Sequence, residues 1–217
     1  LILHLATAMS TIIYFWDDVK KILRSLLKFK KDENFNFSLM IIVSMIPAGL
    51  VGFFYEDKIT QLFNGNLILV GSMLIVTSLL LFISDKMNDL NKKISTKNAI
   101  IIGIAQAFAI LPGISRSGST IATLLFLGVN RDLAAKFSFL MVIPIIVGSS
   151  MKMIIYDNLI FEETILINYI VGFMSALISG YYACKWMIFL VKKSKLIYFS
   201  IYCLLVGIIS ISYSLMQ

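Results

Sequence analysis

Residues 111–120 hold the side chains best suited to chemistry, in the order Leu-Pro-Gly-Ile-Ser-Arg-Ser-Gly-Ser-Thr. Four hydroxyl groups stand close to Arg116 in this stretch, those of Ser115, Ser117, Ser119 and Thr120. An apolar run continues from Ile121, which predicts that the polar cluster lies at the N-terminus of a helix. Unpaired N–H groups, the positive end of the helix dipole and hydroxyl donors together favour a bound anion. A guanidinium adds the bidentate geometry that suits phosphate.

Two features of the same stretch support a phosphate-binding site. Arg116 lies between apolar runs, and an arginine at membrane depth is costly and marks a functional site by default. Gly113 and Gly118 permit turns and the close approach of another backbone. The residues alone leave one alternative open, in which the stretch is a broken transport helix whose serines only cap it.

The composition of the chain identifies the environment of this site. Of 217 residues, 59% are hydrophobic and 14% are charged, whereas a soluble domain has roughly 45–50% apolar and about 25% charged residues. The chain is therefore predicted to be an integral membrane protein, and disorder and a disulfide-rich scaffold are excluded. The net charge of +7 comes mostly from short connections between apolar runs, which favours membrane topology over a nucleic-acid partner.

Six apolar runs are predicted to cross the hydrocarbon core, which takes roughly 17–25 helical residues. They are 1–16, which is cut short at its start, 39–55, 67–83, 137–156, 165–190 and 196–215. A seventh apolar region, 98–129, is interrupted by Pro112 and Gly113, and each of its arms is too short for a comfortable crossing. We expect this region to be a re-entrant helix-loop-helix.

The basic residues decide between re-entry and a single crossing. If region 98–129 enters and leaves on one side, fifteen Lys and Arg residues fall on that side and one, Lys58, falls on the other. A single crossing would exchange the sides of the connections 157–164 and 191–195 and violate the positive-inside rule. The basic side is therefore predicted to be cytoplasmic, with both ends of the chain outside.

We expect one membrane domain over residues 1–217. Three spans within 1–83 form a first repeat, three spans within 137–215 form a second, and the re-entrant region 98–129 precedes the second. An odd number of spans in each repeat makes the two repeats inverted in topology, as in transporter-like folds. The chain opens inside an apolar run at Leu1 without a charged leader, so we expect its natural N-terminus to lie upstream.

Residues 112–120, Pro-Gly-Ile-Ser-Arg-Ser-Gly-Ser-Thr, resemble the PGxSRSxxT signature of the bacterial undecaprenyl-pyrophosphate phosphatases, the bacitracin-resistance family. The flanking stretches 103–109, 128–131 and 137–144 are similar to that family as well, and the resemblance covers essentially the whole chain. It implies a membrane enzyme that hydrolyses undecaprenyl diphosphate to undecaprenyl phosphate and phosphate. This activity would recycle the lipid carrier for peptidoglycan synthesis and confer bacitracin resistance.

The resemblance also implies roles for the residues of the motif. Four residues are expected to be catalytic: Arg116, Ser115, Ser117 and Thr120. Three more are expected to bind the substrate: Gly113, Gly118 and Ser119. Arg116 would clamp the diphosphate while the hydroxyls donate hydrogen bonds to its oxygens, and the identity of the nucleophile is left open.

A second motif of the family, rich in acidic residues and containing a histidine, has no match in residues 1–217. The resemblance therefore implies that it lies before Leu1, together with a first re-entrant loop. A Mg²⁺ or Ca²⁺ cofactor is expected from the family, held by those upstream acids, and no metal ligand is expected in this chain. The 217-residue chain alone is accordingly expected to be inactive.

The expected partners are a polyprenyl diphosphate lipid and the bacterial inner membrane, with a homodimer left open and no nucleic acid. The alternative function is a transporter or flippase, which would bind a phosphorylated lipid or anion with the same arginine and move it by alternating access. Acidic residues upstream of Leu1 favour the enzyme, and their absence there would favour the transporter.

Overall fold

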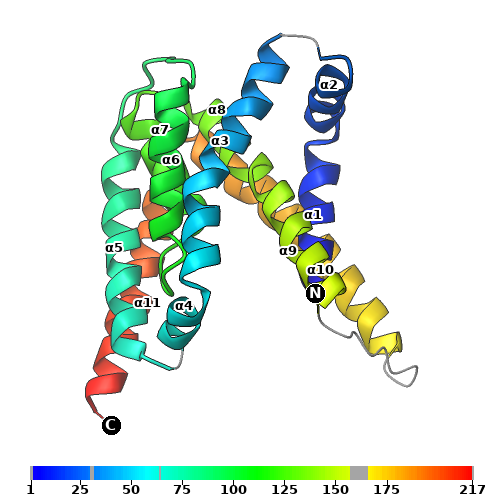
Figure 1. Ribbon diagram of the computed structural model, residues 1–217. Helices are drawn as coiled ribbons and strands as arrows, with labels where there is room; N and C mark the ends of the chain where they lie inside the picture. The colour runs from blue at the N-terminus through cyan, green and yellow to red at the C-terminus, as the bar shows by residue number, and fades with distance from the viewer. Residues whose placement is uncertain (1, 30–31, 64, 157–165, 217) are drawn as a thin grey trace. The chain divides into compact units, whose positions relative to one another are not determined.

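The computed structural model describes residues 2–29, 32–63, 65–156 and 166–216. Over these ranges the chain forms helices joined by turns and short connections, without a strand (Figure 1). The all-α class predicted from the sequence is therefore confirmed for the described part of the chain. Helices satisfy their backbone hydrogen bonds internally, which a lipid environment requires.

Five helical segments among the described residues are long and apolar enough to cross a membrane. They are α3 (Glu33–Phe54), α5 (Leu67–Asp85), the segment Arg131–Met151, α10 (Leu166–Lys192) and α11 (Ile197–Leu215). Each segment overlaps one of the apolar runs predicted above. The chain is thus a multi-pass integral membrane protein by the length and composition of its helices.

The first apolar run differs from the prediction. Helix α1 (Ile2–Tyr14) is apolar but has 13 residues, fewer than the roughly 17–25 that a crossing takes. A turn at Phe15 ends it, and α2 (Trp16–Leu27) begins at the next residue, where the sequence analysis expected a connection. The count of six spans therefore stays a prediction.

A proline accounts for a break in the fourth predicted run. Helix α8 (Arg131–Leu140) ends before Met141, and α9 (Val142–Tyr156) begins after it. Pro144 has no N–H, and in a continuous helix its ring would clash with the carbonyl group of Leu140, four residues earlier. The predicted run 137–156 is therefore divided between two helices.

The helices gather into two compact units, each built from segments far apart in the sequence. One unit contains Leu1–Ser38 and Phe139–Phe189, and the other contains Leu39–Ser138 and Leu190–Gln217. In the first unit α1 packs against α9. A Cβ added to Gly180 of α10 would lie 2.6 Å from Oγ of Ser10 in α1, so small residues let these two helices approach closely. The inverted repeats 1–83 and 137–215 stay a prediction.

In the second unit α5 and α11 form a tightly packed pair, referred to below as the frame. A Cβ added to Gly71 would lie 2.8 Å from the carbonyl oxygen of Gly207, and a Cβ on Gly207 would lie 2.8 Å from that of Gly71. The side chains of Ser78 and Ser200 hydrogen-bond at 3.0 Å, and the Ser200 hydroxyl donates to the Ser78 carbonyl at 2.8 Å. Small residues and interhelical hydrogen bonds stabilise helix pairs in membranes.

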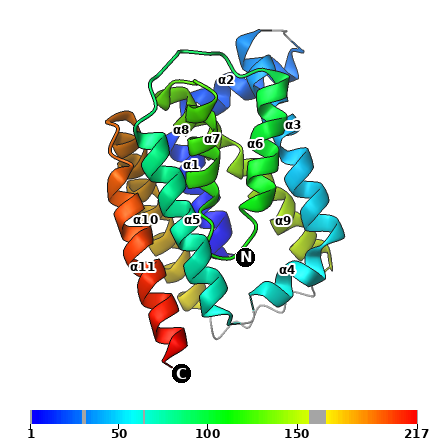
Figure 2. The same cartoon turned by 90° about the vertical axis from the view of Figure 1, so that its left-hand side faces the viewer.

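Two short helices, α6 (Thr96–Phe108) and α7 (Arg116–Phe126), lie side by side in the second unit (Figure 2). Helix α7 packs against α5 of the frame. Helix α6 contacts α3, because a Cβ added to Gly103 would lie 2.5 Å from the carbonyl oxygen of Ser44. We call α6, α7 and the turn between them the hairpin.

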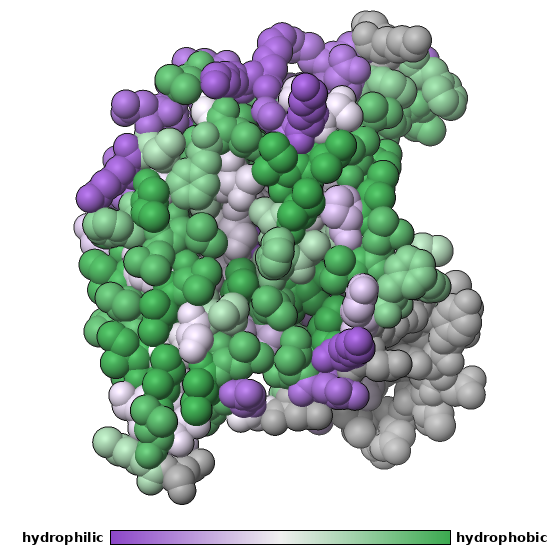
Figure 3. All heavy atoms as spheres, turned by 60° about the vertical axis from the view of Figure 1, so that its left-hand side comes forward, coloured by the Kyte–Doolittle hydropathy of each residue, from purple (hydrophilic) through white to green (hydrophobic). Residues whose placement is uncertain are grey.

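The hairpin turns at Pro112 and Gly113, where the sequence analysis expected a break. Its outer ends are held together, because the N–H of Lys92 before α6 donates to the carbonyl of Gly128 after α7 at 3.1 Å. Figure 3 shows hydrophilic side chains gathered around the connection between α5 and α6, and apolar side chains along the flanks of the helices. The turn of the hairpin and its polar motif therefore lie at the opposite end of α7 from this connection.

Candidate functional site

The polar stretch of the sequence forms the start of α7, as predicted. Ser115 precedes the helix, and its Oγ accepts a hydrogen bond from the N–H of Gly118 at 3.1 Å. The carbonyl of Ser115 accepts from the N–H of Ser119 at 2.8 Å. The first N–H groups of a helix have no carbonyl partner within it, and the helix dipole places partial positive charge at this end.

Two glycines give the start of α7 its close contacts. Gly113 has a φ of +96°, and a Cβ there would collide with the carbonyl oxygen of Val70 and lie 2.9 Å from Cβ of Met73 in α5. Gly118 is buried, and a Cβ there would lie 2.9 Å from Oγ of Ser115. Both positions therefore require glycine for contacts within the protein, and their contact with a substrate stays a prediction.

Thr77 of α5 fastens the turn to the frame. Its Oγ1 accepts a hydrogen bond from the N–H of Ser115 at 3.1 Å and donates to the carbonyl of Gly113 at 3.2 Å or of Met73 at 3.1 Å. The Thr77 side chain is buried. The sequence analysis did not identify this residue, because a single threonine inside an apolar run carries no local signal for a contact made 38 residues away.

Thr120 lies one turn into α7 and is buried. Its hydroxyl donates to the carbonyl of Arg116 at 3.0 Å or of Ser117 at 3.2 Å, and its Oγ1 lies 2.6 Å from Oγ of Ser138 in α8. Ser138 is buried as well and was missed by the sequence analysis for the same reason as Thr77. The Thr120 hydroxyl is thus engaged inside the protein, and its contact with phosphate stays a prediction.

Two buried polar atoms of the hairpin lack a hydrogen-bond partner among the described residues. They are Oγ of Ser119, a residue 4% exposed, and Oε1 of Gln106 in α6, a residue 2% exposed. Buried polar groups are nearly always hydrogen-bonded, so each of these atoms retains the capacity to bind a water or a ligand. Ser119 belongs to the predicted substrate-binding set, whereas Gln106 was not assigned to the site.

Arg116 is the first residue of α7 and is half-buried. Within the described part of the chain its guanidinium has no ion pair or hydrogen bond. The half-buried side chains of Ser115 and Ser117 lie on either side of it in the sequence, and neither hydroxyl donates to a described residue. The first turn of α7 therefore offers a cation, hydroxyl donors and free N–H groups at once, which suits a multiply charged oxyanion.

The acidic residues nearest to the motif along the chain are engaged with cations. Oδ1 of Asp89 lies 3.7 Å from Nε of Arg131, and Oδ1 of Asp132 lies 2.6 Å from Nζ of Lys192. Among the residues that the structure describes, no group of three or more His, Cys, Asp or Glu side chains is placed to hold a metal ion. The donors of the motif do not fit a divalent cation either, so the Mg²⁺ or Ca²⁺ cofactor stays a prediction.

Comparison with known proteins finds relatives along the whole chain. Residues 1–209 match the protein family described as bacitracin resistance protein BacA. A protein of Christiangramia forsetii named undecaprenyl-diphosphatase is 49% identical over 216 residues, which cover 100% of this chain and 82% of that protein. A protein of Bacteroides fragilis with the same name is 47% identical over 222 residues, covering 100% and 83%. Another of that name, from Methanococcus vannielii, is 40% identical over 217 residues, covering 97% and 83%.

Proposed function

The chain belongs to the bacitracin resistance protein BacA family, and we propose that it is a membrane phosphatase that hydrolyses undecaprenyl diphosphate to undecaprenyl phosphate and inorganic phosphate. The names of its relatives support this activity. The structural observation that carries the proposal is the first turn of α7, where the guanidinium of Arg116 has no partner among the described residues.

The start of α7 binds the diphosphate through donors alone. Arg116 holds two oxygens of the terminal phosphate with its planar fork. The hydroxyls of Ser115 and Ser117 and the free N–H groups of the helix bind further oxygens. Because negative charge shifts onto the departing groups during hydrolysis, a fixed cation at this point stabilises the transition state.

The remaining residues of the motif complete the proposed site. The unpaired Oγ of Ser119 supports its assignment to the substrate. Gly113 and Gly118 give the turn the backbone path that brings the donors together. Thr120 belongs to the proposed catalytic set, although its hydroxyl already bonds within the protein.

The product of the reaction gives the enzyme its place in the cell. Hydrolysis returns the lipid carrier to the monophosphate for peptidoglycan synthesis, and the same activity confers bacitracin resistance. We place the protein in the bacterial inner membrane, with both ends of this chain on the outer side, as the positive-inside rule favours.

We further propose six spans arranged as two inverted repeats, 1–83 and 137–215, with the hairpin as a re-entrant element. Two observations support re-entry. Helices α6 and α7 have 13 and 11 residues, too few to cross alone. The hydrogen bond between Lys92 and Gly128 keeps the outer ends of the hairpin on the same side.

The activity is tested with the protein expressed from its complete gene and purified in detergent. Given a polyprenyl diphosphate and Mg²⁺, it should release inorganic phosphate, and a chelator should stop the release if the predicted cation is required. A protein that leaves the diphosphate intact but moves it across liposomes is a transporter, and the phosphatase proposal is then wrong.

The topology is tested by labelling single cysteines in a variant that lacks Cys184 and Cys203. A cysteine at Lys93 should react only with a reagent applied from the cytoplasm. A cysteine at position 162, which lies outside the described residues, should react only from the outside. Cytoplasmic labelling of position 162 would contradict re-entry of the hairpin.

A further inference from the structure

Helix α2 differs from the apolar helices around it because it separates two kinds of side chain. Successive residues of an α-helix are about 100° apart around its axis. Six apolar residues therefore share one face: Trp16, Val19, Ile22, Leu23, Leu26 and Leu27. The opposite face carries charges, those of Asp17, Asp18, Lys20, Lys21 and Arg24, and Lys28 follows the helix on that side. This pattern is typical of helices that lie at a membrane surface.

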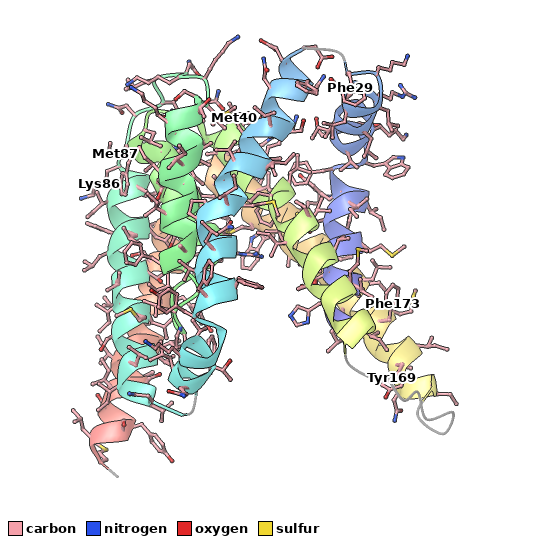
Figure 4. The ribbon with its side chains drawn as sticks, viewed as in Figure 1. Phe29, Met40, Lys86, Met87, Tyr169 and Phe173 are labelled. Carbon is pink, nitrogen blue, oxygen red and sulfur yellow. The ribbon has the colours of Figure 1, made fainter. Side chains whose placement is uncertain are left out.

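The protein covers only one edge of this apolar face. Val19, Ile22 and Leu26 are half-buried. Trp16, Leu23 and Leu27 fall within an arc of about 40° and are exposed, Leu27 to 80%. Phe29, labelled in Figure 4 just beyond the end of α2, is 82% exposed.

Cations lie directly beside the uncovered apolar edge. Nζ of Lys20 is 4.9 Å from the centre of the Trp16 ring and 3.9 Å from Oδ1 of the exposed Asp17. Arg24 and Lys28 continue the same edge along the helix, one turn apart, and both are exposed. An apolar strip and a cationic strip thus run side by side along α2.

The direction of α2 places both strips along a surface. Phe15 interrupts the regular helix between α1 and α2. Figure 1 shows α2 nearly end-on above α1, and Figure 2 shows it from the side, so α2 lies across the end of α1. Because α1 is an apolar helix, a helix across its end is in the position that amphipathic helices take at the boundary between lipid and water.

We propose that the exposed edge of α2, formed by Trp16, Leu23, Leu27 and Phe29 with Lys20, Arg24 and Lys28, binds an anionic phospholipid. The apolar residues enter the upper part of the acyl chains, and the cations bind the phosphate of the headgroup. A zwitterionic lipid carries no net negative charge for Arg24 and Lys28 to bind. An acidic peptide would bind these cations but leave the apolar side chains of Leu27 and Phe29 exposed to water. This lipid is distinct from a diphosphate bound at the start of α7.

The experiment uses the fluorescence of Trp16 in the complete protein, in a variant where Trp16 is the only tryptophan, which includes Trp186→Phe. The protein is placed in nanodiscs that contain brominated phosphatidylglycerol in phosphatidylcholine, or brominated phosphatidylcholine at the same mole fraction. Bromine quenches tryptophan only at close contact. We expect the brominated phosphatidylglycerol to quench Trp16 severalfold more strongly, and the preference to shrink at high salt.

Two variants with equal loss of charge provide the control. Replacing Lys20, Arg24 and Lys28 by Gln should abolish the preference for phosphatidylglycerol. Replacing Lys92, Lys97 and Lys195 by Gln, three exposed cations outside α2, should leave the preference intact. Equal quenching by both lipids, no quenching by either, or loss of preference only in the control variant would overturn the proposal. None of these results depends on phosphatase activity.

Discussion

Two arginines lie at opposite ends of α7, and they differ in whether the guanidinium contacts other residues of the protein. Arg131 follows the helix and is 6% exposed. Its Nη2 donates hydrogen bonds to the carbonyl oxygens of Asp85 at 2.8 Å and Met87 at 3.0 Å. It also forms ion pairs, with Nη1 3.8 Å from Oδ1 of Asp85 and Nε 3.7 Å from Oδ1 of Asp89. Arg116 begins the helix and has no such partner among the described residues.

The difference shows what each guanidinium is available to do. Arg131 binds the end of α5 and the connection after it, and Oδ1 of Asp85 also accepts from the N–H of Leu196 at the start of α11 at 2.9 Å. This cluster joins the outer end of the hairpin to the frame. A guanidinium has five N–H donors. In Arg131 both hydrogen bonds come from Nη2, and Nη1 and Nε lie beside the carboxylates of Asp85 and Asp89, whereas no donor of the Arg116 guanidinium has a partner among the described residues.

The largest effect is expected for Arg116→Lys, which keeps the charge but removes the planar fork. Phosphate release from a polyprenyl diphosphate should fall by a factor on the order of 10²–10³, as for the loss of one electrostatic donor. The melting temperature should stay close to that of the wild type, because no described residue bonds to the guanidinium. The same substitution at exposed Arg24 is the control. Wild-type turnover in Arg116→Lys would mean that Arg116 is structural.

Arg131→Met should reduce the stability of the protein, whereas Arg116→Lys should reduce its activity and leave its stability unchanged. The substitution removes the donor to two carbonyl oxygens and the cation beside the carboxylate of Asp85, which is 12% exposed and keeps its hydrogen bond from the N–H of Leu196. This should lower the free energy of unfolding by about 3 kcal/mol, or roughly 6–12 °C in melting temperature. Asp132→Asn breaks the exposed pair with Lys192 and should cost less than about 1 kcal/mol. Equal stability of the two variants would contradict the assigned role of Arg131.

Part of this contrast could be predicted from the sequence. The signals at Pro112, Gly113 and Ser115 are local, since a proline, a glycine and a capping hydroxyl act on their own backbone. They predicted the break in the hairpin and the start of α7, which the structure confirms. Apolar length likewise predicted the five helical segments among the described residues that are long and apolar enough to cross a membrane.

The rest depends on contacts that no local pattern encodes. Thr77 and Ser138 are hydroxyls inside apolar runs, and their partners are 38 and 18 residues away in the sequence. The pairing of Arg131 with Asp85 spans 46 residues. Helix α2 was different, because its amphipathic periodicity was present in the sequence but lay within a segment interpreted only as a basic connection.

Thr77→Val tests whether the start of α7 must be held against the frame for Arg116 to act. Valine keeps the shape but leaves the N–H of Ser115 unpaired, which costs about 1–2 kcal/mol. The displaced turn should lower phosphate release about tenfold, since misplacement of a binding group by 1 Å can cost on the order of 10²-fold.

Two further variants identify the cause of that loss. Thr77→Ser restores the hydroxyl and should recover activity to within about threefold of wild type. Among the described residues the Thr123 hydroxyl bonds only to the Ser119 carbonyl within α7. Thr123→Val removes this hydroxyl and should leave phosphate release nearly unchanged. A Thr77→Ser protein as impaired as Thr77→Val would mean that packing, rather than the hydrogen bond, positions the turn.

The smallest effect is expected for Ser138→Ala. Comparing this variant with Thr120→Val shows whether the Thr120 hydroxyl itself contacts phosphate. The Thr120 hydroxyl can donate to the carbonyl of Arg116 or Ser117, and Ser138 can then donate to Thr120. Removing the Ser138 hydroxyl therefore leaves the Thr120 proton satisfied and should cost about 1 kcal/mol of stability. If Thr120 donates to phosphate in the bound state, Thr120→Val should lower phosphate release far more than Ser138→Ala does. If the Thr120 hydroxyl instead only joins α7 to α8, Thr120→Val, Ser138→Ala and the double variant should all lose the same amount of activity. The effects of two residues that act as one pair do not add.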